Sequence, residues 1–480
     1  MSSSVRSELI HLVSRRQLLR RMTGGIAAAA LASLGGGSQG LLRARPRERS
    51  FDLKPRPGMI PARANAVIQL FMNGGPSQVD LWDPKPDLTR FHGQKPPKGI
   101  GTPNSELETY GGLMASPFQF SRYGKSGIEV SEVLPHLASM VDELAIIRSM
   151  HTMTFQHEEA LWVMHSGTRQ DGRPSLGSWV TFALGSENQN LPAYVALCDP
   201  KGLPINGAKS WSNGWMPPIY QGTPLRSEGM PVLNLYPEQP RSDAVRQGRQ
   251  DLLRKLNQEH RRLHPGELEL DARIESYELA ARMQLSATDA LDLSQESKAT
   301  RELYGLDNDV TLSYGTRCLI ARRLVERGVR FVQIFMRGQP WDTHSKSRKQ
   351  ISKCCAETDL PAAGLLKDLK QRGLLDTTLV TWGGEFGRQP VSQDGDGRDH
   401  NPQAFSSVLA GGGIKGGQVY GATDDFGYKS VENPVGVPDL HATMLHLLGL
   451  DHHRLTLPYD GRTQRLTDVH EARVIHDLLA

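Results

Sequence analysis

Residues 66–77 read AVIQLFMNGGPS, and this stretch decides the fold class. Its first seven residues are apolar except for Gln69, and the run ends at Gly74-Gly75-Pro76. A short apolar run that is stopped by Gly and Pro is typical of a strand in a parallel sheet, where both faces of the strand are buried. The stretch therefore predicts a buried parallel strand at the start of the ordered domain.

Further apolar runs of this kind alternate with helical patterns along the chain. Such an alternation predicts an α/β sandwich with a mostly parallel sheet. Residues 242–304 are instead polar and helix-prone without a strand pattern, so we expect a helical insertion there. The runs begin at Leu144 (LAIIRSM), Ala193 (AYVALC), Val329 (VRFVQIFM), Thr378 (TLVTW) and Ser406 (SSVLAGGG).

Near the N-terminus, residues 14–37 read SRRQLLRRMTGGIAAAALASLGGG, an arginine pair followed by a weakly apolar run without acids. This order resembles a twin-arginine export signal. We therefore expect residues 1–48 to engage the twin-arginine translocation machinery and the protein to be periplasmic or extracellular. The alternative is a basic, poorly ordered N-terminus. The run from Ile26 to Leu34 is too short to span a bilayer, so we expect membrane contact only through the signal.

The next residues, 49–62, are charged and proline-rich, and we expect them to form a linker before one domain over residues 63–480. The chain has 56 basic and 52 acidic residues, but nine of its arginines lie in the first 49 positions. Because the basic excess belongs to the N-terminus, the composition argues against a nucleic-acid partner.

Polar side chains follow several of the predicted strands. In open α/β sheets the loops at the carboxyl ends of the strands converge, and sites form there. Carboxylate, amide and imidazole groups together suit zinc, manganese, magnesium or calcium. The side chains that follow predicted strands are Asn73 and Ser77; His151, Thr154 and His157; Asp342 and His344; and Glu385, Arg388, Asp399 and His400.

Each of these residues also has an ordinary structural interpretation. Asn73 and Ser77 could form a turn and a helix cap, and Asp342 could likewise cap a helix. Glu385 could pair with Arg388, and Asp399 with Arg398, as ordinary surface ion pairs. Recurrence at several strand ends favours a shared site with a divalent metal ion.

Five segments together resemble one bacterial family. They are LFMNGGPSQVDLWDPKP (70–86), GRPSLGSWVTFALGSENQNLPAYVAL (172–197), GGEFGRQP (383–390), GRDHNPQAFSSVLAGGGIKGG (397–417) and DLHATMLHLLGLDH (439–452). The chain is similar over about residues 63–478 to the sulfatase-like family called domain of unknown function fifteen-oh-one, within the alkaline phosphatase and sulfatase superfamily. The resemblance implies a three-layer α/β/α sandwich of alkaline phosphatase type with a helical subdomain.

The resemblance also implies a metal set. Superfamily members bind one or two divalent metals and transfer phosphate, sulfate or related groups through a Ser, Thr or formylglycine nucleophile. By position, Asn73 stands where a metal-binding Asp is usual, and Glu385 stands where an Asp-His-Gly is usual. The implied metal ligands are Asn73, Asp342, His344, Glu385 and His400.

The nucleophile is where the chain departs from the superfamily pattern. The segment HEEALWVMHSG (157–167) resembles the helix that opens with the nucleophile, which places His157 at that position. No C-x-P-S-R motif is present, which argues against a formylglycine sulfatase. Ser77 and Thr154 are two hydroxyl candidates.

Three roles for the site stay open. His157 could be a metal ligand or general acid/base while water attacks directly, it could be the nucleophile itself, or the site could bind without turnover. We favour the first, with Arg388 or Arg148 holding an oxyanion by bidentate contact. The expected function is metal-dependent hydrolysis of a sulfate or phosphate ester, on a small molecule or a carbohydrate, outside the cytoplasm. The competing function is a non-catalytic envelope protein that binds metal or anion.

Overall fold

The computed structural model describes residues 51–97, 100, 111–226, 242–264, 267–393 and 395–480. The export signal expected over residues 1–48 lies outside these described residues. Within them, no helix combines the length and the apolar character that crossing a membrane requires.

A nine-stranded sheet forms the centre of the fold, and the expected α/β architecture is confirmed. Its strand order is β12-β4-β11-β8-β1-β7-β5-β6, with β15 also pairing with β4. All pairings are parallel except those that β11 makes with β4 and β8. The strands are β1 (Ala66–Phe71), β4 (Leu144–His151), β5 (Tyr194–Leu197), β6 (Thr223–Leu225), β7 (Phe331–Phe335), β8 (Thr378–Gly383), β11 (Phe405–Ala410), β12 (Gln418–Tyr420) and β15 (Val435–Gly436).

Strand β1 lies inside this sheet, between β7 and β8, and all six of its residues are buried. Its one polar residue, Gln69, is satisfied across the sheet, because Gln333 Nε2 of β7 donates to Gln69 Oε1 at 2.6 Å. Gln333 Oε1 in turn accepts from the hydroxyl of Tyr194 on β5. The buried amides therefore tie three strands together, since an unpaired buried polar group would cost free energy.

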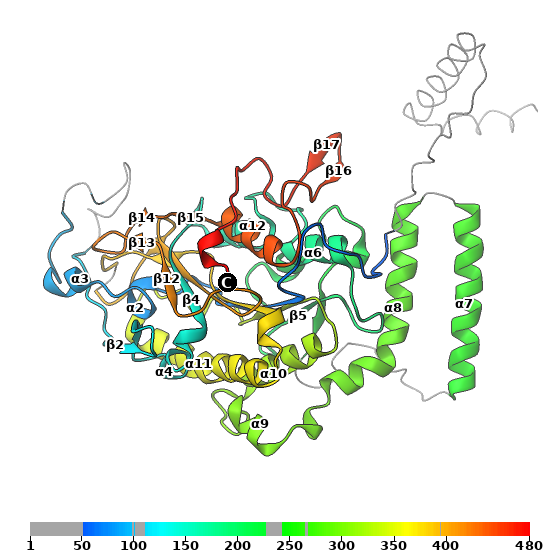
Figure 1. Ribbon diagram of the computed structural model, residues 1–480, viewed down its shortest axis with the longest axis horizontal. Helices are drawn as coiled ribbons and strands as arrows, with labels where there is room; N and C mark the ends of the chain where they lie inside the picture. The colour runs from blue at the N-terminus through cyan, green and yellow to red at the C-terminus, as the bar shows by residue number, and fades with distance from the viewer. Residues whose placement is uncertain (1–50, 98–99, 101–110, 227–241, 265–266, 394) are drawn as a thin grey trace, which may run out of the picture. The chain divides into compact units, whose positions relative to one another are not determined.

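Helices cover both faces of the sheet (Figure 1). Helices α10 and α11 lie against one face, and α6 and α12 lie on the other. This double cover explains why the central strands are apolar without alternation. The helices are α2 (Gln78–Leu81), α3 (Pro86–Arg90), α4 (Pro135–Ala138), α5 (His157–Ser166), α6 (Leu176–Leu184), α7 (Asp243–Leu263), α8 (Leu268–Leu291), α9 (Lys298–Leu303), α10 (Leu312–Glu326), α11 (Ser347–Gln371) and α12 (Val437–Leu447).

The polar region expected as a helical insertion, residues 242–304, contains α7, α8 and α9. Helix α7 begins at a serine cap, in which Ser242 Oγ accepts from Val245 N at 3.4 Å. Short two-stranded sheets join the remaining loops: β2 (Phe120–Tyr123) with β3 (Ile128–Ser131), β9 (Gly387–Arg388) with β10 (His400–Asn401), β13 (Ala422–Thr423) with β14 (Ser430–Glu432), and β16 (Leu457–Tyr459) with β17 (Arg462–Gln464).

Residues 49–62 were expected to form a linker, but the described part of this segment, which begins at Phe51, is hydrogen-bonded to the domain. Arg56 N donates to Leu184 O at 2.9 Å, and Met59 N donates to Gly449 O at 2.7 Å. Leu53 is buried in the main core. Proline and charge therefore mark an extended segment that packs on the domain rather than a free spacer.

Two buried histidines predict how stability depends on pH. Burial lowers the pKa of His165 to about 3 and the pKa of His441 to about 4. Histidine in an unfolded chain has a pKa of about 6.5. Below that pH, His165 and His441 bind protons in the unfolded state but stay neutral in the folded state. We expect the free energy of unfolding to fall between about pH 6.5 and pH 4, by up to about 1.4 kcal/mol per pH unit for each histidine.

Urea unfolding of the parent and of a His165→Gln variant across this pH range measures the effect. The variant should show a shallower slope whatever its stability at pH 7. Equal slopes in the two proteins would contradict the assignment of His165 as a neutral buried group.

Candidate metal centre

The candidate centre lies at the carboxyl ends of three neighbouring parallel strands. Asn73 follows β1, the loop with Asp342 and His344 follows β7, and Glu385 follows β8. Two further elements complete the site: α5 begins at His157, and the β9–β10 pair places His400 opposite Arg388. The structure thus brings together side chains from both halves of the chain.

Asp342 is the residue that these side chains share. Its Oδ1 lies 2.7 Å from Arg388 Nη2, 2.9 Å from His344 Nε2 and 3.1 Å from His400 Nε2. Its Oδ2 lies 3.4 Å from His157 Nε2. One carboxylate therefore faces three imidazoles and one guanidinium.

The charges of the centre are strongly coupled. Burial opposes ionisation of Asp342, but the three imidazoles and Arg388 outweigh it and hold the pKa of Asp342 far below its usual range. Burial alone would lower the pKa of His157, but the Asp342 and Glu385 carboxylates outweigh burial and hold this pKa above its ordinary value. Asp342 raises the pKa of His344, whereas burial lowers the pKa of His400.

Glu385 fixes the orientation of His157. Its Oε1 lies 2.7 Å from His157 Nδ1 and also accepts from Gly74 N at 2.8 Å. Because a carboxylate can only accept, His157 Nδ1 carries the proton in this contact, which leaves Nε2, 3.4 Å from Asp342 Oδ2, as the ring atom that could bind a metal ion. A carboxylate behind an imidazole is the usual support of a metal-binding histidine.

Among the described residues, three buried polar atoms at the centre lack a hydrogen-bond partner: Glu385 Oε2, Asn73 Oδ1 and His157 Nε2, although the last lies 3.4 Å from Asp342 Oδ2. The Asn73 amide is held by its other end, since Nδ2 donates to Met336 O at 2.6 Å and to Gly338 O at 2.7 Å. Buried polar atoms without partners are rare and need an explanation. A cation bound to His157 Nε2 would supply it for that atom.

Two overlapping groups of side chains could hold such a cation. His157, Asp342 and His400 form the first, and His344, Asp399 and His400 form the second; within each group the ligand atoms lie within 4.8 Å of one another. His344 Nε2 and His400 Nε2 are only 2.9 Å apart. Imidazole and carboxylate groups that converge in this way fit a divalent transition metal.

Asp399 was among the polar side chains that follow predicted strands, but not among the five metal ligands that the family resemblance implies. It is next to His400, and its Oδ1 lies 3.7 Å from His344 Nδ1. The signal in the sequence was adjacency to His400, but Asp399 also follows Arg398, and an ordinary surface ion pair was the simpler interpretation. Arg398 instead pairs with Asp80, at 2.9 Å from Nε to Oδ2.

Arg388 lies at the centre, as expected, but its groups are already committed. It is fully buried. Its Nε donates to Gly75 O at 2.9 Å, its Nη1 donates to Arg398 O at 3.2 Å, and its Nη2 contacts Gly74 O and Asp342. The geometry therefore replaces the expected role in holding an oxyanion with one in positioning Asp342.

Gly74 and Gly75, whose carbonyl groups accept from Arg388, lie where close packing leaves no room for a Cβ atom. Gly74 has a φ of +112°, and a Cβ there would lie 2.6 Å from Asp342 N. Gly75 has a φ of +78°, and a Cβ there would lie 2.6 Å from the Phe386 ring. Both conformations are ones that residues with a Cβ rarely adopt.

The remaining candidates, Ser77, Thr154 and Arg148, are hydrogen-bonded to groups other than the shared carboxylate of Asp342. Ser77 Oγ donates to Asp80 Oδ2 at 2.6 Å, and Thr154 Oγ1 accepts from Gln156 N at 3.3 Å. Arg148 Nε donates to Trp82 O at 2.8 Å. Within the described part of the chain, no hydroxyl is hydrogen-bonded to the side chains of Asp342 or His157.

The sequence as a whole matches one family. Residues 64–479 match the family described as protein of unknown function (DUF1501). The chain belongs to the DUF1501 family. No curated protein sequence matches this DUF1501 protein.

Several solved structures match the DUF1501 chain at low similarity. The PsFucS1 sulfatase from Pseudoalteromonas sp. is 13% identical, with a TM-score of 0.37 over 87% of this chain and 72% of that chain. The lipoteichoic acid synthase LtaP from Listeria monocytogenes is 9% identical, with a TM-score of 0.36 over 84% and 76%. The phosphonate monoester hydrolase SpPMH from Silicibacter pomeroyi is 10% identical, with a TM-score of 0.35 over 87% and 76%.

Replacing Arg388 tests how the centre is held. An Arg388→Met variant leaves the Asp342 carboxylate and the carbonyls of Gly74 and Gly75 without their buried donor. We expect it to lower the free energy of unfolding by about 3 kcal/mol or more, as for other buried pairs that lose one partner. Urea unfolding at pH 7 measures the change.

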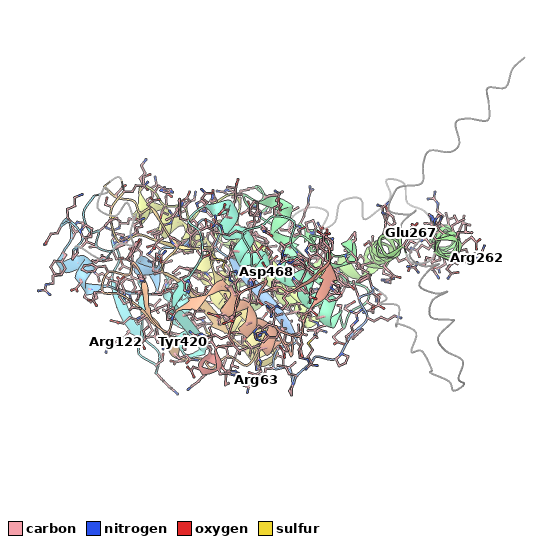
Figure 2. The ribbon with its side chains drawn as sticks, turned by 90° about the horizontal axis from the view of Figure 1, so that it is seen from above. Arg63, Arg122, Arg262, Glu267, Tyr420 and Asp468 are labelled. Carbon is pink, nitrogen blue, oxygen red and sulfur yellow. The ribbon has the colours of Figure 1, made fainter. Side chains whose placement is uncertain are left out.

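Arg122 of β2 provides the control, because its side chain is exposed at the surface (Figure 2). An Arg122→Met change should stay within about 0.5 kcal/mol of the parent. Equal stability of the Arg388→Met variant and the parent would show that Asp342 does not depend on this cation.

Proposed function

We propose that this DUF1501 protein is a metal-dependent hydrolase of sulfate or phosphate esters that acts after export. One observation carries the proposal: three imidazoles and the Asp342 carboxylate converge beside buried ligand atoms that have no partner. The location of the centre favours a catalytic role over a purely structural one, because in open α/β sheets ligands bind at the carboxyl ends of the strands.

We propose zinc as the ion, held by His157, Asp342 and His400, with His344 and Asp399 as further ligands. Imidazole ligands suit zinc, whereas calcium and magnesium prefer oxygen. A divalent ion supplies stabilisation of the negative charge that develops on the ester oxygens and makes water a stronger nucleophile.

The protein's own residues have separate tasks in this proposal. Arg388 and Glu385 position Asp342 and His157. His157 binds the ion or transfers a proton, as in the first of the three roles described above. The geometry supports this role over a hydroxyl nucleophile, because the hydroxyl of Ser77 already donates to Asp80.

The substrate class and the route of export rest on the sequence. We propose an ester of a small molecule or a carbohydrate, by analogy with exported sulfatases. The twin-arginine pattern in residues 14–37 supports export by the twin-arginine machinery to the periplasm or the exterior.

Metal content tests the centre directly. The full chain and an Asp342→Asn/His400→Gln variant are incubated with zinc, manganese, magnesium and calcium, and bound metal is measured by elemental mass spectrometry. We expect about one or more ions per chain in the parent and a loss of at least tenfold in the variant, because two of the proposed ligands are gone.

An Asp451→Asn/His453→Gln variant is the matched control, since it removes the same two types of side chain outside the centre. It should bind metal as the parent does. A parent without metal, or a double variant that keeps it, would remove the basis of the proposal. Metal-loaded parent that hydrolyses none of a broad panel of sulfate and phosphate esters would favour the non-catalytic envelope protein.

The support that Glu385 gives to His157 makes a second prediction. A Glu385→Gln variant keeps the shape of the side chain but removes the charge behind Nδ1. We expect the affinity for zinc to fall by about 10- to 100-fold, as for other residues that orient a metal-binding histidine. Competition with a zinc chelator measures the affinity, and unchanged affinity would contradict this role for Glu385.

A further inference from the structure

A groove of about 690 Å³ is lined in part by residues that follow His344 and precede His400 in the chain. One wall consists of His92 and residues 114–117, and the other consists of Lys346, Arg348, Lys349 and Ser352 at the start of α11. Gly395 and Asp396 complete the lining. The groove is therefore lined by the segment that follows His344 in the chain and by the segment that precedes His400.

The groove has a marked excess of positive charge. Lys346, Arg348 and Lys349 are exposed, and among the described residues none of them has a carboxylate within ion-pair distance. Among the described residues, the lining has one carboxylate, Asp396, whose Oδ1 accepts from the backbone N of Lys346 at 2.8 Å. Positive side chains in the first turn of a helix oppose the helix dipole, so these cations do not serve the stability of α11.

The wall with the cations is continuous with the centre. Lys346 follows His344 by two residues, which limits their Cα separation to about 7 Å. Ser347 N donates to Asp396 O at 3.0 Å, and Arg398 N donates to Thr343 O at 3.1 Å. The two loops that carry His344 and His400 therefore also form the groove.

The conformation of Lys346 is fixed rather than accidental. Its φ is +52°, which is uncommon for a residue with a side chain. The bond to Asp396 holds its amide, and Gln350 N donates to its carbonyl at 3.0 Å. The turn thereby keeps three cations on the wall next to the ligand loop.

We propose that this groove binds the additional anionic groups of a polymeric substrate, a linear chain that carries several sulfate or phosphate groups. One group occupies the metal centre, while neighbouring groups contact Lys346, Arg348 and Lys349. The inference rests on the proposed ester hydrolysis and names its substrate class. A row of cations that have no carboxylate partner among the described residues would raise the local concentration of such a chain and align it with the centre.

Binding of fluorescein-labelled dextran sulfate to the zinc-treated full chain, followed by fluorescence anisotropy, tests the proposal. A Lys346→Gln/Arg348→Gln/Lys349→Gln variant should bind at least tenfold more weakly. An Arg122→Gln/Lys125→Gln/Lys415→Gln variant loses the same number of exposed charges elsewhere and should change by less than twofold. All three proteins keep the N-terminal arginines, so their contribution cancels in the comparison.

Lysine acetylation read by mass spectrometry locates the contact independently of substitution. Dextran sulfate should protect Lys346 and Lys349 of the parent at least threefold more than Lys125 and Lys415. Neutral dextran should protect none of them. Inorganic polyphosphate of matched charge forms a parallel arm, and tighter binding of one polymer identifies sulfate or phosphate as the preferred group.

Equal losses in the two triple variants, or equal protection of all four lysines, would overturn the proposal. Metal content measured on the same samples separates it from the proposed function. Zinc bound without polymer binding overturns the groove alone, whereas polymer bound at the groove without zinc supports the groove and overturns the hydrolase.

Discussion

The ionised carboxylate of Asp342 is the interaction on which the rest of the centre depends. A partly buried negative charge is stable only when cations and donors surround it, and here Arg388 and three imidazoles do so. Arg388 in turn donates to the carbonyls of Gly74 and Gly75, which fixes the loop after β1. Glu385 repeats this pattern by accepting from Gly74 and contacting His157. Each loop of the centre is thus held by a group of another loop.

Much of the fold follows from the sequence. The apolar runs at Ala66, Leu144, Val329 and Thr378 are strands, because segments buried on both faces between helices need no polar alternation. The direction of β11 does not follow, since an apolar run reads the same in a parallel and an antiparallel strand. Nor does the attachment of residues 51–62, because backbone hydrogen bonds such as that from Met59 to Gly449 depend on atoms that every residue carries.

Part of the candidate centre could be predicted from the apolar runs that mark the strands. Asp342, His344 and Glu385 are polar residues just after apolar runs, and the parallel order of β1, β7 and β8 brings them to one edge. The burial of Arg388 and the position of Asp399 near His344 were not foreseeable, because a sequence does not show which arginine is buried or which acid lies near a given histidine. The groove does not follow from the sequence either, because the contact between Lys346 and Asp396 joins residues that are 50 positions apart.

The position of β1 has a consequence for synthesis. Gln69 and its partner Gln333 are separated by 264 residues, yet their strands are neighbours in the centre of the sheet. At a translation rate of about 5–20 residues per second, the first strand waits on the order of 10–50 s before its partners leave the ribosome. During that time an apolar strand with two unpaired edges is exposed to other chains. We therefore expect the yield of folded protein in cells to depend on factors that bind nascent chains and cover their exposed strands.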